Sequence, residues 1–296
     1  MENVTLEGEK AKKDSMQRKL TPLIFILILI TGCDNRSTYK EDFVIPQYAE
    51  INTSKDVHSF KNNTITPYIY TKVISLHKLP VKEKKEKFVN MLLPSILYVQ
   101  HILNQKIKRI EYIEKSLAKH PKICQKDSIF LNDLYSIYKC SDLDELKKRL
   151  KPHPASIVLG QAALESGWGS SRFFKEGNNI FGIWSYFSGE DRIEALVGRD
   201  STKIYVRKYA NIEESINDYF ITIARVKAYK TFRNERLQSN NPYILIPFLK
   251  AYSELGSIYT KKLTYLIKSN KLNDYDSYTI DKKYIKKRMI NISENS

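Results

Sequence analysis

Apolar residues recur at three- and four-residue steps through most of the chain, and this spacing constrains the fold more than any other feature. The pattern begins near Thr66 and is clearest between Phe88 and Ile110. It places one apolar stripe along each helix, as expected for helices packed around a core. Pro94 inside the first run predicts a kink or a helix start. Further helices are predicted at residues 111–119, 127–138, 141–150, 154–166, 211–229, 242–253 and 257–269.

Residues 181–209 depart from the helical spacing. Two alternating segments, residues 192–197 and 202–206, flank a break at Gly198, Arg199 and Asp200. Alternation on both sides of a turn cluster predicts a β-hairpin or a small sheet. The predicted fold is therefore mainly α, with a helical domain that carries a small β-hairpin lobe and is preceded by a helical extension.

The amino-terminal region contains a short apolar run, residues 22–30, that follows two basic residues and ends just before Cys33. The run is too short to span a bilayer but suits the core of an export signal. The order of charge, apolar run, small residues and Cys33 resembles the lipobox of bacterial lipoproteins. We therefore expect lipidation at Cys33 and a location in the cell envelope, in either the inner or the outer membrane. The acidic first fifteen residues fit an export signal poorly, which makes Met16 our predicted start.

The composition of the chain excludes some classes of binding partner but does not identify one. The formal net charge is +16, from 49 Lys and Arg against 33 Asp and Glu, which favours an anionic partner or reflects a lysine-rich solvated surface. The basic residues are scattered and form no nucleic-acid-binding motif, so we expect no nucleic-acid partner. The histidines show no ligand spacing, and neither a metal nor another cofactor is expected. With Cys33 lipidated, Cys124 and Cys140 are left as a disulfide or as two thiols.

The segment from Pro154 to Arg172 contains the residues with the clearest chemical signal. Pro154 suits the first turn of a helix, and Gly167 suits its end. Glu165 follows a nearly apolar run, lies in the last helical turn and is close to Trp168. Desolvation and the negative end of the helix dipole both predict a raised pKa for Glu165. A carboxyl group that stays protonated near neutral pH can protonate the leaving oxygen in glycoside hydrolysis. A cap or a salt bridge with Arg172 is the plainer alternative.

Three separated blocks resemble glycoside hydrolase family 73, the bacterial N-acetylglucosaminidases, over roughly residues 150–272. The blocks are Gln161–Gly169, Asn178–Ile183, and Arg207–Tyr209 followed by Glu213–Tyr219. The helical extension and the Ala251–Gly256 segment resemble the Bax-type branch of this family. The resemblance implies a lysozyme-like helical fold with a β lobe. It also implies hydrolysis of the β-1,4 bond after N-acetylglucosamine in peptidoglycan.

The resemblance further implies roles for single residues. Glu165 matches the general acid, and Glu194 is the best match for a second carboxylate on the hairpin, with Glu190 and Asp191 as rivals. The turn that starts at Trp184 departs from the plainer lysine-containing turn of the family. Whether a second carboxylate activates water or the N-acetyl group of the substrate takes part stays open. The candidate substrate-binding residues, of which the aromatic ones are equally suited to core packing, are Trp168, Asn179, Phe181, Trp184, Tyr252 and Tyr259.

These assignments divide the chain into five parts. They are a signal peptide at 1–32, a lipidated polar tether at 33–65, a helical extension at 66–150, a glucosaminidase domain at 151–272, and a disordered basic tail at 273–296. The expected partners are peptidoglycan glycan strands and, through the Cys33 anchor, a membrane. The protein is expected to be a monomer.

Two other functions remain open. A lytic transglycosylase shares the fold and a Glu followed by Ser, but it produces an anhydro sugar. The Gly-Leu-Met-Gln-like motif of that group is absent, and Asn-Asn-Ile-Phe-Gly occupies its place. A non-catalytic wall-binding lipoprotein would keep the aromatic residues and would not need Glu165.

Overall fold

A computed structural model describes residues 38–60, 62–119, 122–195 and 203–291. The predicted signal peptide, the alternative start Met16 and the lipidation site Cys33 lie outside these residues. None of the described helices is long and apolar enough to cross a membrane.

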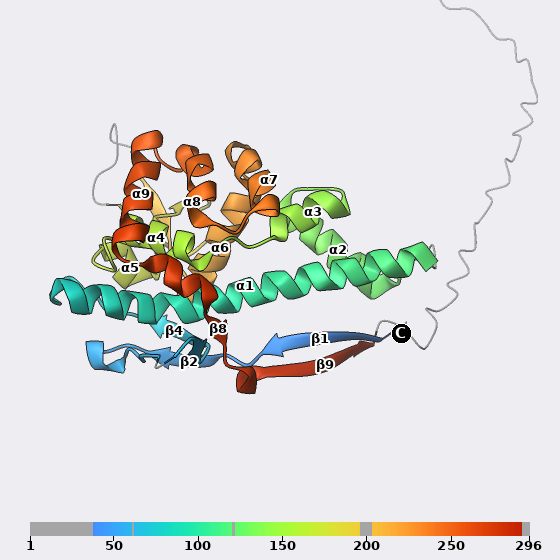
Figure 1. The fold of residues 1–296 in the computed structure, drawn as a ribbon, viewed down its shortest axis with the longest axis horizontal. Coiled ribbons are helices and arrows are strands. Elements are labelled where there is room, and N and C mark those ends of the chain that lie inside the picture. Colours follow the sequence, from blue (N-terminus) through green and yellow to red (C-terminus); the bar gives the residue numbers. More distant parts are fainter. Residues whose placement is uncertain (1–37, 61, 120–121, 196–202, 292–296) are drawn as a thin grey trace, which may run out of the picture.

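One long helix, α1 (Val81–Lys119), runs across the whole molecule (Figure 1). Its buried residues include Phe88, Leu92 and Ile96, which lie on the stripe that the spacing predicts. Pro94 lies inside this helix and not at its start. The two predicted helical segments before Pro121 therefore form a single element with the remaining helices on one side and most of the strands on the other.

The helical side contains eight further α-helices among the described residues, which confirms a mainly α fold. The predicted 211–229 helix ends at Arg225 and gives way to a 3-10 turn, and the helices at Arg172–Gly177 and Lys230–Gln238 were not predicted. The helices are α2 (Gln125–Tyr138), α3 (Leu143–Leu150), α4 (Ala155–Ser166), α5 (Arg172–Gly177), α6 (Ile212–Arg225), α7 (Lys230–Gln238), α8 (Pro242–Leu245) and α9 (Ser257–Ser269). The 3-10 segments on this side are η3 (Lys227–Tyr229), η4 (Ile246–Tyr252) and η5 (Leu272–Ser277).

The predicted β lobe is present as a small antiparallel sheet. Its strands are β5 (Trp184–Ser185), β6 (Arg192–Glu194) and β7 (Tyr205–Arg207), in the order β5-β7-β6. Ile193 pairs with Val206 across the hairpin, as the alternating pattern predicts. The connection at residues 196–202 lies outside the described part of the chain.

The structure corrects the expectations for the tether and the basic tail, because the described parts of both form strands. β1 (Thr38–Val44) pairs antiparallel with β9 (Ile285–Asn291) along its whole length. β2 (Gln47–Glu50) pairs with β4 (Tyr68–Lys72), and β3 (Thr64–Ile65) pairs with β8 (Thr279–Ile280). The core residues of the tether and the tail are too few and too widely spaced to show a period in the sequence, and β1 and β9 are more than two hundred residues apart. The buried hydrophobic residues of these two regions are Tyr39, Val44, Ile51, Val57, Ile65 and Ile280.

The two described cysteines do not form a disulfide. The Cys124 thiol is buried beside Tyr39 and Ile290 and lies 3.5 Å from Asp127 Oδ2. Cys140 is half-buried at the end of α2. Of the two arrangements that the sequence left open, the structure contains two thiols.

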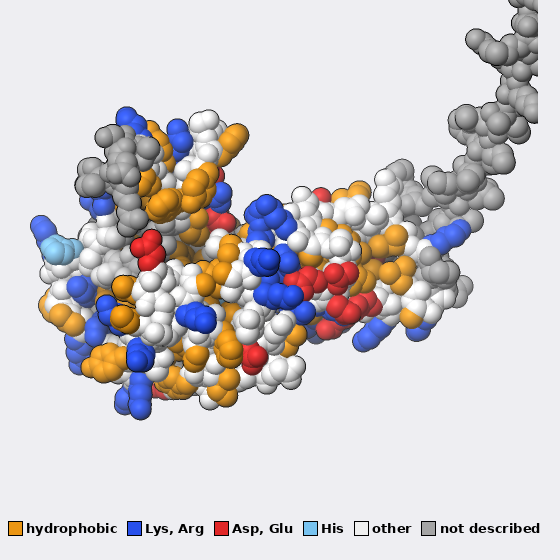
Figure 2. Space-filling model, turned by 90° about the horizontal axis from the view of Figure 1, so that it is seen from above, with side chains coloured by type: hydrophobic (Ala, Val, Ile, Leu, Met, Phe, Trp, Pro, Cys, Tyr) orange, Lys and Arg blue, Asp and Glu red, His pale blue; other side chains and the backbone are white. Residues whose placement is uncertain are grey.

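On the helical face of the described residues, the positive charge is distributed over several places. Figure 2 shows Lys and Arg side chains scattered over the helical face, with hydrophobic and acidic side chains between them. This distribution matches the scatter of basic residues in the sequence.

Candidate active site

Helix α4 carries Glu165 and is anchored at both ends. Ten of its twelve residues are buried, because helices, strands or loops cover nearly every face of it. At its start, the Asp276 carboxylate accepts hydrogen bonds from the Ser156 backbone N–H and hydroxyl, both at 2.7 Å. The acceptor satisfies a donor that the first helical turn leaves without an intrahelical partner. Glu165 lies in the last turn, with its side chain exposed.

The turn after α4 fixes where Glu165 points. Gly167, Trp168 and Gly169 have φ of +58°, +58° and +75°, so three consecutive residues are left-handed. A Cβ at Gly169 would lie 3.2 Å from atoms of three packed side chains, which explains a glycine there. The Ser166 hydroxyl accepts from Gly169 N–H at 3.0 Å and donates to the Ala162 carbonyl at 2.6 Å. A tryptophan rarely adopts a left-handed backbone conformation, so the close packing around this turn must hold the Trp168 backbone in place.

Trp168 packs toward α1. Its ring makes an edge contact with Phe88 at 5.5 Å between centroids, and the Lys85 ammonium lies 5.2 Å from the ring centroid. It lines a surface cavity of about 460 Å³ together with Leu164 and residues of α9, and Glu165 is not among the lining residues. A second cavity, of about 330 Å³, lies on the strand side near His58. Trp168 follows Glu165 by three residues in the chain, but its ring lines a neighbouring surface.

Three tyrosines from three elements surround Glu165. The Tyr259 hydroxyl donates to Glu165 Oε1 at 3.2 Å. Tyr252 stacks on Tyr259 at 5.5 Å between centroids, and Tyr229 lies 6.3 Å from Tyr252. Burial raises the pKa of all three hydroxyls, and the nearby Glu165 charge raises each of them further, to about 12 for Tyr229. These groups therefore stay protonated and surround Glu165 with neutral dipoles.

Glu165 has a raised pKa. Although the side chain is exposed, the surrounding atoms displace part of its hydration, and this desolvation raises its pKa; the hydrogen bond from Tyr259 acts in the opposite direction. Arg172 does not pair with it. Arg172 instead lies 3.2 Å from Glu176 and donates to the Glu194 carbonyl at 2.6 Å. The alternative of a salt bridge between Glu165 and Arg172 is therefore wrong.

The carboxylates of the β lobe have different surroundings. Glu194 is exposed on β6, and its side chain pairs with Lys203 at 3.3 Å. Glu190 lies 3.2 Å from Arg207, which also binds Asp218 at 2.7 Å. Asp191 is exposed and directly precedes β6. Among the described residues, none of these carboxylates hydrogen-bonds to the Glu165 side chain; the β lobe is joined to α5 by other contacts, such as the bond from Arg172 to the Glu194 carbonyl.

Asn179 and Phe181, both predicted as substrate-binding residues, are buried in the structure. The Asn179 amide donates to the carbonyls of Ile183 and Arg207 at 3.0 and 2.9 Å and accepts from Ile183 N–H at 3.0 Å. Phe181 stacks on Tyr219 with 4.3 Å between centroids. Asn179 therefore ties the turn after α5 to β7, and Phe181 packs in the core.

The β lobe instead presents exposed aromatic rings near β5. Trp184 is 49% exposed, and Tyr186 and Phe187 are 84% and 68% exposed. Trp184 is a predicted substrate-binding residue, whereas Tyr186 and Phe187 were not predicted. The one sequence feature that could have indicated Tyr186 and Phe187 is that the turn starting at Trp184 differs from the lysine-containing turn of the family. Large exposed rings of this kind suit stacking on a sugar.

Gln161 is a further site residue that the sequence analysis did not single out. It is fully buried in α4, and its amide bonds to the hydroxyls of Tyr259 and Tyr219. The sequence feature that could have indicated Gln161 is its position as a single amide side chain in an otherwise nearly apolar helix. No cluster of three His, Cys, Asp or Glu side chains suited to a metal ion occurs in the part of the chain that the structure describes.

A family model described as mannosyl-glycoprotein endo-beta-N-acetylglucosaminidase matches residues 140–291, slightly more than half of the 296 residues. The match extends beyond the predicted domain at 151–272 in both directions. Protein bax of Escherichia coli (strain K12) is 30% identical over 131 residues, which make up 42% of this chain and 46% of that protein. The chain thus matches less than half the length of this curated relative.

Solved structures with a similar backbone come from several bacteria. The catalytic domain of the autolysin Auto from Listeria monocytogenes is 24% identical, with a TM-score of 0.36, over 56% of this chain and 96% of that chain. A peptidoglycan hydrolase from Sphingomonas sp. A1 is 22% identical, with a TM-score of 0.35, over 48% and 87%. The glycoside hydrolase domain of Salmonella typhimurium FlgJ is 22% identical, with a TM-score of 0.33, over 47% and 96%. At such TM-scores the likeness carries no conclusion about the chemistry of this chain.

Proposed function

Because the chain belongs to the mannosyl-glycoprotein endo-beta-N-acetylglucosaminidase family of glycoside hydrolases, we propose that it hydrolyses the β-1,4 bond after N-acetylglucosamine in peptidoglycan. The observation that carries this proposal is Glu165, an exposed carboxyl group with a raised pKa at the end of a rigid helix. A carboxyl group with these properties keeps its proton at a higher pH than an ordinary glutamate.

In the proposed mechanism Glu165 is the general acid. Tyr259 occupies Oε1 as a hydrogen-bond donor, which leaves Oε2 as the oxygen that carries the proton. Oε2 donates that proton to the glycosidic oxygen as the bond to the sugar breaks. The neutral tyrosines around Glu165 do not compete for the proton, because their own pKa values are raised.

We assign the second carboxylate to Glu194. It is exposed on the β lobe, whereas Glu190 is partly buried against Arg207 and belongs to the contacts that hold the lobe together. Its role would be to activate the attacking water. The exposed rings of Trp184, Tyr186 and Phe187 would stack on sugar rings of the glycan strand.

The proposed location is the cell envelope, with the protein attached through a lipid on Cys33 and acting as a monomer. Support comes from the lipobox-like order of residues before Cys33. Thr38 begins β1 only five residues later, so such an anchor would hold the folded part close to the membrane surface.

Analysis of the digestion products tests the proposed reaction. Purified protein is incubated with peptidoglycan, and the products are reduced with borohydride and identified by mass spectrometry. We expect fragments that end in reduced N-acetylglucosamine. Anhydro-muramyl ends would instead identify a lytic transglycosylase, and binding to the wall without any cleavage would identify a wall-binding protein.

A further inference from the structure

Five buried side chains form a hydrogen-bonded series that runs from an arginine in α7 to Glu165, and we name them the relay. They are Arg236 in α7, His153 before α4, Tyr219 in α6, Gln161 in α4 and Tyr259 in α9. Each is at most 5% exposed. The successive distances are 3.3 Å (Arg236 Nη1 to His153 Nδ1), 2.7 Å (His153 Nε2 to Tyr219 hydroxyl), 2.7 Å (Tyr219 hydroxyl to Gln161 Oε1), 3.0 Å (Gln161 Nε2 to Tyr259 hydroxyl) and 3.2 Å (Tyr259 hydroxyl to Glu165 Oε1).

The relay has a single direction. A guanidinium group can only donate, so His153 Nδ1 accepts from Arg236, and the proton of the neutral ring lies on Nε2. Burial and the nearby Arg236 charge hold the pKa of His153 well below its usual value, which keeps the ring neutral. Nε2 then donates to the Tyr219 hydroxyl, which in turn donates to the Gln161 carbonyl oxygen. The chain continues in the same sense from the amide nitrogen to the last tyrosine, and every donor points toward Glu165.

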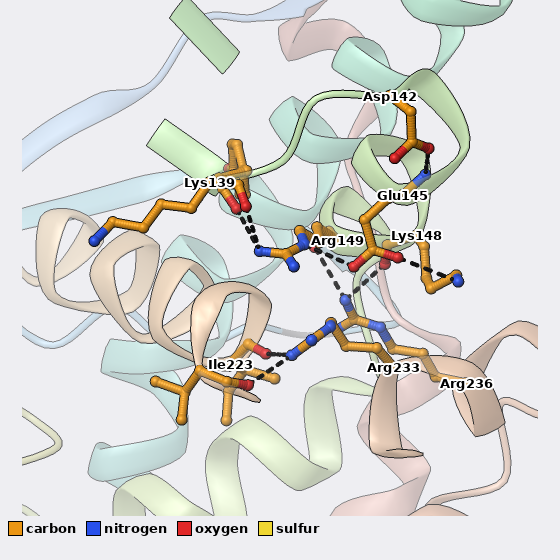
Figure 3. Close-up of polar contacts among 10 residues, drawn as sticks. Lys139, Asp142, Glu145, Lys148, Arg149, Ile223, Arg233 and Arg236 are labelled. Atoms are coloured by element: carbon orange, nitrogen blue, oxygen red, sulfur yellow. Dashed lines mark hydrogen bonds and ion pairs between the residues drawn. The ribbon is translucent and has the colours of Figure 1, made fainter. Parts of the chain in front are cut away.

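The distal end of the relay is firmly held. Arg236 Nη2 donates to the carbonyls of Lys148 and Arg149 at 3.0 Å each, at the C-terminal end of α3. Figure 3 shows Arg236 reaching these carbonyls beside Arg233, whose guanidinium donates to the Ile223 carbonyl. Both arginines lie in the core, where Arg233 Nη1 and Arg236 Nη2 bond to backbone carbonyl oxygens. The carbonyls of α3 therefore fix the position of the first donor.

We propose that the relay positions the general acid, with Tyr219, His153 and Arg236 as positioning residues that act on Glu165 through Gln161 and Tyr259. This inference rests on the proposed function of Glu165. The anchored end prevents the relay from reversing its direction, so a donor always faces Glu165 Oε1. The catalytic proton is thereby confined to Oε2. Successive hydrogen bonds that point the same way also strengthen one another.

The relay predicts the sign of a pKa change. The groups that face Glu165 from neighbouring elements are Tyr229 from η3, Tyr252 from η4 and Tyr259 from α9. Glu165 forms no ion pair with any described residue. The donor at Oε1 stabilises the carboxylate form, so its loss or weakening should raise the pKa of Glu165. The high-pH limb of kcat, which reports loss of the acid proton, should then move to higher pH.

The test measures the pKa of Glu165 directly, by NMR titration of the full chain carrying ¹³C-labelled glutamate, with Glu165→Gln used to assign the signal. Tyr259→Phe should raise the pKa, and Tyr219→Phe should raise it in the same direction by a smaller amount. We expect kcat of Tyr219→Phe to fall about 2- to 10-fold, the rate equivalent of one neutral hydrogen bond. The high-pH limb of kcat should move with the pKa in both variants.

A double variant separates a relay from simple core damage. In the Tyr259→Phe background, Tyr219→Phe should leave the Glu165 pKa unchanged, because the connection is already broken. Tyr70→Phe is the matched control, since its buried hydroxyl accepts a hydrogen bond from His58 N–H at 3.1 Å on the strand side of α1. This control should leave the Glu165 pKa and kcat unchanged.

An unchanged Glu165 pKa in Tyr219→Phe, or an equal shift in the Tyr70→Phe control, would overturn the relay. An effect of Tyr219→Phe that persists without the Tyr259 hydroxyl would do the same. The titration does not depend on activity, so failure of the proposed function is distinguishable: Glu165→Gln would then retain activity whatever the pKa values show.

Discussion

At the scale of single residues, two opposing influences set the behaviour of Glu165. Partial loss of hydration raises its pKa, and the hydrogen bond from Tyr259 reduces that rise. The left-handed turn at Gly167, Trp168 and Gly169 keeps the helix end in place. The result is an acid whose position is fixed by the fold and whose proton affinity exceeds that of an ordinary glutamate.

The raised pKa of Glu165 also predicts a pH-dependent effect on stability. The folded state binds this proton more tightly than the unfolded chain, so the contribution of Glu165 to stability is fully present in acid and is lost as the pH rises through its folded pKa. Glu165→Gln cannot ionise and avoids this loss. Its melting temperature relative to wild type should therefore be higher near neutral pH than in acid. Thermal melts across pH check this, with Glu176→Gln, an exposed neighbour paired with Arg172, as the control.

A difference between Glu165→Gln and wild type that stays constant or falls toward neutral pH would contradict the raised pKa. The measurement is independent of substrate. It therefore tests the electrostatics of the site separately from its reaction.

Residue-level prediction succeeded where the determining contacts are local in the sequence. An apolar run followed by a glycine turn is visible in the chain around Glu165, and it predicted both the helix end and the direction of the pKa change. The partners of Asn179 and Phe181 inside the protein, Arg207 and Tyr219, come from later segments and were not predicted. Tyr252 and Tyr259 do lie beside Glu165, and their role in binding a glycan stays a prediction.

At the scale of elements, the two ends of the described chain meet. β1 and β9 form an antiparallel ribbon beside α1 (Figure 1). Strand pairing between the two ends of a sequence depends on contacts that no local pattern reveals. The helices, whose periods are local, were predicted in most cases with small errors at their ends, whereas this ribbon was not predicted.

Removal of β9 tests whether the ribbon of β1 and β9 shields the Cys124 thiol from solvent. Deletion of residues 285–296 should uncover the Cys124 thiol, which is buried beside Tyr39 and Ile290. In a background with Cys33→Ala, we expect Cys124 to react with a thiol reagent several-fold faster in the truncated protein than in the full-length one. Cys140, at the other end of α2, is the internal reference and should keep its rate. Equal rates for Cys124 in both proteins would show that β9 does not cover this part of the core.

At the scale of the whole molecule, α1 connects a strand side to a helical side that contains the proposed active site. Its side chains Lys85 and Phe88 reach Trp168 in the turn beside Glu165. The helical extension is therefore part of the support of the site and not a separate spacer. On the face drawn in Figure 2, Lys and Arg side chains are dispersed between hydrophobic and acidic ones.

The rate of peptidoglycan cleavage by Glu165→Gln tests the central claim most directly. The exchange of a carboxyl for an amide keeps the shape and the hydrogen bond from Tyr259 but removes the acid proton. We expect the rate to fall by about 100- to 10,000-fold, the usual contribution of general acid catalysis, while Glu176→Gln stays close to wild type. A Glu165→Gln protein that is folded and cleaves peptidoglycan at the wild-type rate would contradict the account.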